Sequence, residues 1–240
     1  IWWARAWRTR AVAARQRGDA AAALHGYEQM AAVVQQALQR HPGDGELLSE
    51  LGSAHLGRGQ VFNTWSLAHL NRPDDAMTAF AQAEAVYQQL VDEGRATVED
   101  RHQLGTIAGA RMMICHDRGR LAEALEHGER ALRVRQDNVA HAPEHVAMRN
   151  ALATEANNFG YVLLAAGRVR LGDRPSALRA LRNATGLDHD ALTLLLALGA
   201  EARETYRHDQ PARTRADKAQ GAARCGCARI DKRTFACSCG

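Results

Sequence analysis

The chain has 240 residues with a formal net charge of +4, and 46% of its residues are hydrophobic. Aromatic residues make up only 5%, and no alternating run of Val, Ile and Thr is long enough to predict a sheet, so we expect an all-α fold. The only lysines are Lys218 and Lys232, which excludes from the first 217 residues any phosphate-binding loop, Schiff base or kinase ATP site that needs a lysine.

Residues 1–17 form a basic, tryptophan-rich lead-in, for which we predict a helix over residues 2–16. The segment has five arginines and no acid, with Trp2, Trp3 and Trp7 among them. Tryptophan beside arginine is typical of the cytoplasmic flank of a membrane span, so one hypothesis is a juxtamembrane segment with a membrane tether upstream of Ile1. The alternative is an amphipathic helix whose tryptophans cap the helices that follow.

A small-residue pattern recurs four times along the chain, opening at Ala23, Ala76, Ala124 and Ala177. Five positions before each alanine stands a residue that readily adopts the left-handed conformation: Gly18, Asn71, Gly119 and Gly172. Further contact positions follow four and seven residues after each alanine, namely Tyr27 and Met30, Phe80 and Ala83, Gly128 and Ala131, Leu181 and Ala184. The pattern predicts antiparallel helical hairpins that turn at the glycine or asparagine.

The spacing between the alanines indicates long repeats. It is 53, 48 and 53 residues, against roughly 34 for a tetratricopeptide repeat. We therefore predict an α-solenoid of stretched tetratricopeptide-like hairpins, with an irregular helical bundle as the alternative. The first helix of each pair carries a glycine in register, where we expect a neighbouring helix to approach closely: Gly52, Gly105 and Gly160.

The predicted helices cover most of the chain, and all five prolines lie in or beside connections. They span residues 2–16, 20–40, 44–60, 74–93, 97–117, 120–137, 143–170, 174–185 and 188–207. The stretch from Gly59 to Asp74 breaks the repeat pattern, and we interpret it as an insertion. We expect its Phe62 and Trp65 to be buried in the core. The alternative is that the insertion contacts a partner. Residues 18–207 are the predicted repeat domain, and residues 208–240 are a basic, Cys-rich tail that we expect to be disordered.

The tail contains two Cys-x-Cys pairs, Cys225 with Cys227 and Cys237 with Cys239. Four thiolates can hold one zinc ion or close two disulfides, which leaves a metal- or redox-responsive helical adaptor as an alternative function. We favour a disordered or non-native end, and we assign no cofactor and no metal site.

Two other groups of reactive side chains receive structural interpretations. His141 and His145 have the spacing of a metal pair on a helix, but Pro143 between them argues against a regular turn there. Cys115 is adjacent to His116, yet neighbours in sequence do not face each other on a helix, so we expect Cys115 to be a small buried hydrophobe.

Charge is concentrated at the two ends of the chain. Residues 1–17 carry +5 and residues 203–240 carry another +5, which leaves −6 for the body. We therefore expect a protein or peptide partner and no nucleic acid. The chain has no Gly-x-Ser-x-Gly, Asp-Phe-Gly or His-Glu-x-x-His motif, so we do not expect it to be an enzyme.

The run from Leu48 to Met77, LSELGSAHLGRGQVFNTWSLAHLNRPDDAM, is similar to the repeat segment that follows the kinase domain in some bacterial eukaryotic-like serine/threonine kinases. The resemblance extends over roughly residues 1–185 and excludes the tail. It implies a cytoplasmic regulatory or sensor region that follows a kinase domain and a membrane helix or linker; with a membrane helix, it would lie at the cytoplasmic side of the inner membrane. No kinase motif residue is present, so no catalytic role is carried over.

We therefore expect a non-catalytic protein–protein interaction scaffold. In tetratricopeptide arrays the first helix of each pair lines the inner groove, where asparagine and tyrosine side chains can hold a peptide backbone. With the Leu-Gly elements in register, the candidate partner-binding residues are Glu50, Ser53, His102, Thr106, Asn157, Asn158 and Tyr161.

Overall fold

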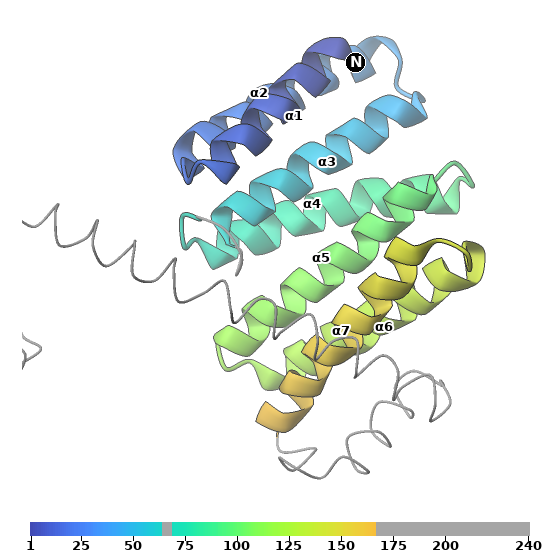
Figure 1. The fold of residues 1–240 in the computed structure, drawn as a ribbon. Coiled ribbons are helices and arrows are strands. Elements are labelled where there is room, and N and C mark those ends of the chain that lie inside the picture. The colour runs from blue at the N-terminus through green and yellow to red at the C-terminus, as the bar shows by residue number, and fades with distance from the viewer. Residues whose placement is uncertain (64–68, 167–240) are drawn as a thin grey trace, which may run out of the picture. The chain divides into compact units, whose positions relative to one another are not determined.

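The computed structural model describes residues 1–63 and 69–166, which form seven helices and no strand. Within this part of the chain the fold is all-α, as predicted (Figure 1). All of these residues belong to one compact unit. In chain order the helices are α1 (Trp2–Gln16), α2 (Ala20–Arg40), α3 (Gly45–Phe62), α4 (Pro73–Asp92), α5 (Val98–Asp117), α6 (Leu121–His141) and α7 (Val146–Ala165).

The helix boundaries lie close to the predicted ones, with three differences. Helix α3 continues to Phe62 and takes in the start of the predicted insertion, while α6 continues to His141. Helix α7 begins three residues later than predicted, because residues 142–145, which include Pro143, turn the chain. The predicted helices 174–185 and 188–207 and the tail lie outside the described residues.

Left-handed residues turn the chain within each hairpin, as predicted. The backbone φ is +82° at Gly18, +54° at Asn71 and +71° at Gly119. Glycine adopts this conformation without the penalty that a Cβ brings, and asparagine tolerates it better than most residues. Local sequence therefore sets the three turns, whereas Gly172 lies outside the described residues.

Side-chain hydrogen bonds cap the N-termini of α3 and α5, the first helices of the second and third hairpins. Asp44 accepts hydrogen bonds from the backbone N–H groups of Glu46 and Leu47 at the start of α3. Thr97 and Asp100 form a reciprocal capping box at the start of α5. Asp100 also accepts a 2.6 Å hydrogen bond from the Ser49 hydroxyl, so the cap of α5 links this helix to α3.

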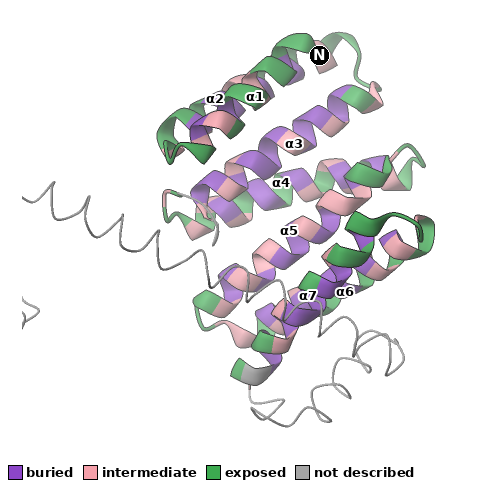
Figure 2. Cartoon of the chain, viewed as in Figure 1, coloured by how far each residue is buried: buried purple, intermediate pink, exposed green. Residues whose placement is uncertain are grey.

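Each helix packs on the next one along the chain, and α1 also contacts α3, as α5 contacts α7. Figure 2 shows buried residues along the helices where they meet. The predicted contact positions of the first three repeats are all buried: Ala23, Tyr27, Met30, Ala76, Phe80, Ala83, Ala124, Gly128 and Ala131. The small-residue pattern therefore marks the packed faces of α2, α4 and α6.

Glycines on the first helices let side chains of the second helices lie directly on the backbone. A Cβ built at Gly52 would lie 2.7 Å from the ring of Tyr87, and one at Gly105 would lie 2.7 Å from the guanidinium of Arg135. The predicted close approach is thus confirmed at these two positions. No described residue lies within 4 Å of a Cβ at Gly160, whose expected partner helix lies outside the described range.

The end of α3 confirms that Phe62 fills the core. Phe62 is buried, and the Arg72 guanidinium lies 4.8 Å from its ring centroid. The backbone N–H of Arg72 donates to the Phe62 carbonyl at 2.8 Å, and that of Leu70 donates to the Val61 carbonyl at 2.9 Å. These contacts return the chain to α3 before α4 begins; Trp65 lies outside the described residues.

Helix α1 packs on the array through small residues, with Ala4, Ala11 and Ala14 buried. Of its tryptophans, only Trp7 packs against the core; Trp2 and Trp3 are 85% and 75% exposed. One of the three tryptophans therefore packs on the helices that follow, as the capping hypothesis expects. Among the helices of the described residues, none is long and apolar enough to cross a bilayer.

We predict that Gly128→Ala lowers the free energy of unfolding by about 1–3 kcal/mol. The new methyl group would lie 2.2 Å from the Phe159 ring, which outweighs the gain in helix propensity of about 1 kcal/mol. Urea denaturation followed by circular dichroism measures the change. Gly43→Ala is the control, since no atom lies within 4 Å of its Cβ; equal stability of the two variants would contradict the packing argument.

Candidate functional site

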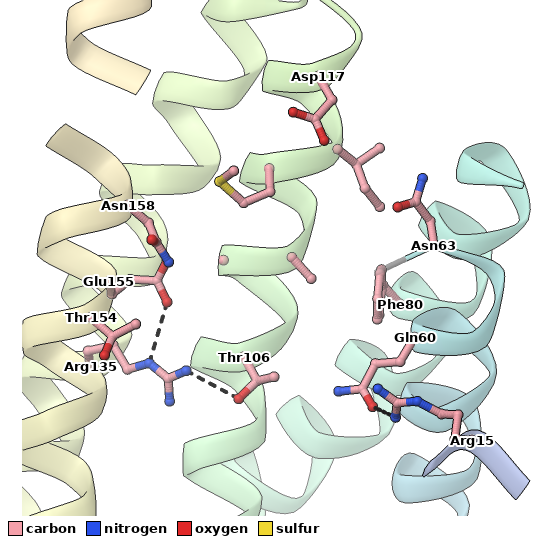
Figure 3. A pocket seen from close by; sticks show the side chains of 14 residues that line it. Arg15, Gln60, Asn63, Phe80, Thr106, Asp117, Arg135, Thr154, Glu155 and Asn158 are labelled. Atoms are coloured by element: carbon pink, nitrogen blue, oxygen red, sulfur yellow. Dashed lines mark hydrogen bonds and ion pairs between the residues drawn. The ribbon is translucent and has the colours of Figure 1, made fainter. Parts of the chain in front are cut away.

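A cavity of about 210 Å³ opens on the side of the first helices of the hairpins (Figure 3). Most of the residues in its wall belong to α5 and α7, while α1, α3, α4 and α6 contribute one residue each and Asn63 follows α3. Apolar side chains such as Phe80 and Met113 share the wall with hydrogen-bonding groups, which include those of Gln60, Asn63, Thr106, Thr154, Glu155 and Asn158. Side chains from distant parts of the sequence therefore face one common space.

Two of the seven candidate residues, Thr106 and Asn158, line this cavity. His102 lies one helical turn before Thr106 and binds the same arginine, Arg135. Asn157 is buried, whereas Tyr161 is 40% exposed and Ser53 is half-buried. The predicted register thus brings residues of α5 and α7 to the cavity, but it does not bring Ser53, Asn157 or Tyr161 there.

Glu50 belongs to the contact between α1 and α3. It is 5% exposed, and its two carboxylate oxygens lie 3.1 Å from Arg5 and 3.2 Å from Arg8. Arg5 also pairs with Glu46. Two arginines of the basic lead-in therefore neutralise acids of α3.

A buried ion pair lies on the α6 and α7 side of the cavity. The Nε atom of Arg135 is 3.7 Å from Oε2 of Glu155, and the two side chains are only 7% and 6% exposed. Arg135 donates through one terminal nitrogen to the carbonyl of His102 at 2.8 Å, and through the other to the Thr106 hydroxyl at 3.2 Å. The arginine therefore joins α5, α6 and α7.

Two glycines of α5 make room for this pair. A Cβ at Gly105 would lie 2.7 Å from the Arg135 guanidinium, and one at Gly109 would lie 2.5 Å from both oxygens of Glu155. The two glycines are one turn apart and leave a slot along α5 into which the charged groups fit. Sequence reasoning found Gly105 but missed Gly109, although the four-residue spacing between them signals a helix face without side chains.

Burial shifts the pKa values of Glu155 and His102. It raises the pKa of Glu155 to about 7, against the opposing effect of Arg135. Burial, together with the positive charge of Arg135, lowers the pKa of His102. Near neutral pH His102 is thus uncharged, which suits its contact with a guanidinium, while Glu155 exchanges its proton in the physiological range.

The remaining reactive side chains have the structural roles expected of them. Cys115 is buried in the core cluster of α5, α6 and α7, and burial raises the pKa of its thiol. His141 ends α6 and His145 precedes α7, so the two do not share a helix. Within residues 1–63 and 69–166, no group of three His, Cys, Asp or Glu side chains could hold a metal ion.

We predict that Glu155→Gln becomes more stable relative to the wild type as the pH rises. Because the pKa of Glu155 is raised from 4.5 to about 7 on folding, the folded wild-type protein keeps a proton that the unfolded chain loses between these values, and its stability falls over that interval. Glutamine does not titrate, so the stability difference should change by on the order of 3 kcal/mol. Urea denaturation at about pH 5 and about pH 8 measures it.

The control for this titration is Glu126→Gln, which removes an exposed carboxylate from α6. Its stability relative to the wild type should stay nearly constant over the same pH range. Taking differences between proteins cancels the titration of His102 and other groups to first order. A pH-independent difference for Glu155→Gln would contradict a raised pKa.

The sequence matches no protein-family model, and no curated protein matches it significantly. The interpretation of the cavity therefore rests on the chain's own residues.

Proposed function

We propose that this chain is a non-catalytic protein–protein interaction scaffold of tetratricopeptide type, whose first helices bind an extended peptide. The observation that carries the proposal is the cavity of about 210 Å³ to which the first helices α1, α3, α5 and α7 all contribute. Hydrogen-bonding groups of these helices, from distant parts of the sequence, face the same space. A cavity that crosses several hairpins suits an extended ligand better than a compact one.

The finer architecture that we propose is an α-solenoid of stretched hairpins, α1 with α2, α3 with α4, and α5 with α6. Its support is the repetition of one turn conformation, at Gly18, Asn71 and Gly119, and of one buried small-residue pattern after each turn. In such arrays each repeat buries its apolar face on its neighbours and leaves another face for partners. The first helices would form the partner face here.

The chemistry of the cavity favours a peptide backbone as ligand. Carboxamide side chains such as those of Asn63 and Asn158 carry both donors and acceptors. They can therefore pair with the N–H and C=O groups of an extended chain, whichever way these point. The Thr154 hydroxyl, which donates to the Asn150 carbonyl, adds a further acceptor along the wall.

We further propose that this scaffold is the regulatory or sensor part of a bacterial signalling protein, a serine/threonine kinase. The support is the similarity of residues 48–77 to repeat segments that follow such kinase domains. The arginines and exposed tryptophans of α1 fit a position at the cytoplasmic side of the inner membrane, because indole rings favour the membrane interface.

We predict that Asn158→Ala weakens peptide binding about tenfold without lowering the melting temperature by more than about two degrees. The half-buried Asn158 lines the cavity, so its amide would contact the ligand and contribute little to the core. Peptides selected from a random dodecamer display library on the purified protein serve as ligands, and isothermal titration calorimetry measures their affinity.

Asn150→Ala is the matched control, since Asn150 is an exposed residue of the same helix outside the cavity. It should leave both affinity and melting temperature unchanged. A library that yields no binding peptide would contradict the scaffold function. Parallel loss of affinity and stability in Asn158→Ala would instead give this residue a structural role.

A further inference from the structure

Glu155 offers a hydrogen-bond acceptor that the described residues do not use. Its side chain lines the cavity, is 5% exposed as a residue, and has no hydrogen-bond partner at Oε1. A buried carboxylate without its full set of donors is costly, typically by more than a neutral group would be. Such an oxygen at a cavity wall points to a ligand that brings a donor.

Arg135 does not supply this donor. Its terminal nitrogens are directed to His102 and Thr106 of α5, and its Nε faces the other oxygen, Oε2, at 3.7 Å. That distance is too long for a good hydrogen bond. The negative charge of Glu155 is thus only partly compensated within the fold.

The groups around Glu155 favour a positive donor over a neutral one. Thr154 and Asn158 lie on the same helix and line the same cavity, and both carry oxygens that can accept hydrogen bonds. Asp117 adds a second carboxylate to the wall. The other arginine of the cavity, Arg15, lies across the cavity from Glu155 in Figure 3 and donates to Gln60.

The carboxylate can turn toward an incoming group without repacking of the core. The terminal torsion of a glutamate is soft and roughly twofold, so either oxygen can face the cavity while the other stays near Arg135. At Gly109, α5 has no side chain opposite the carboxylate, and both carboxylate oxygens lie where a Cβ would be.

We infer that Glu155, with Thr154 and Asn158, forms a subsite for a cationic side chain, the lysine or arginine of a peptide bound in the cavity. The inference rests on the proposed function and adds to it a preference in partner sequence. An ammonium or guanidinium group would donate to the unpaired oxygen and complete the neutralisation of the buried charge. The burial that raises the pKa of Glu155 supports this, since a bound cation would favour the ionised form.

The test uses the peptides selected on the full chain. Lysine or arginine should be enriched at one position of the selected sequences. Changing that residue to glutamine in the peptide should weaken binding to the wild-type protein about tenfold, as expected for a charge-assisted hydrogen bond. The same change should weaken binding to Glu155→Gln by less than about twofold, which would place the cation at Glu155.

Glu126→Gln, which removes an exposed charge from α6, should behave like the wild type throughout. Acetylation of the peptide lysine removes the same charge without altering the protein, and it should also weaken binding about tenfold. Glu155→Asp retains the charge but shortens the side chain by one methylene group, so it should keep the preference for a basic residue while reducing the effect of the peptide change below tenfold. It replaces Glu155→Gln in this comparison if that variant does not fold.

The outcomes separate this inference from the proposed function. Selected peptides without a basic preference, or equal losses in wild type and Glu155→Gln, would overturn the subsite and leave the scaffold function intact. The absence of any selected peptide would overturn both.

Discussion

The packing of side chains from α6 and α7 onto the glycines of α5 is the contact on which the candidate site depends. Gly105 and Gly109 leave the backbone of α5 open to Arg135 and Glu155, which a Cβ at either position would displace. The same arrangement recurs at Gly52, where the Tyr87 ring lies on α3. Glycine thus allows neighbouring helices to share a surface so closely that polar groups of three helices meet at one point.

The buried Arg135–Glu155 pair explains why this region can both hold the fold together and recognise a ligand. Moving a charge pair out of water costs free energy. The attraction between the two charges offsets this cost only when both groups are fully hydrogen-bonded. Arg135 has most of its partners, whereas Glu155 lacks one. Both terminal nitrogens of the arginine are hydrogen-bonded within the fold, whereas one oxygen of the carboxylate, in the wall of the cavity, is not.

Within the described residues, local sequence was sufficient to predict the helices and their turns. Alanines at helical spacing and a left-handed residue five positions earlier are signals within one hairpin, so α2, α4 and α6 could be placed well. The candidate site depends on contacts between hairpins, such as that of Arg135 with Glu155. No local pattern specifies the rotation of one hairpin against the next, which is why Arg135 and Glu155 were missed, although Thr106 and Asn158 were among the predicted partner-binding residues.

The crystal structure of the protein with a selected peptide tests the central claim most directly. The account predicts that the peptide lies extended in the cavity between α3, α5 and α7, with side-chain hydrogen bonds from Asn158 to its backbone. A peptide seated instead on the outer faces of α2, α4 and α6 would contradict it, because the cavity lined by Asn158 would then have no part in recognition.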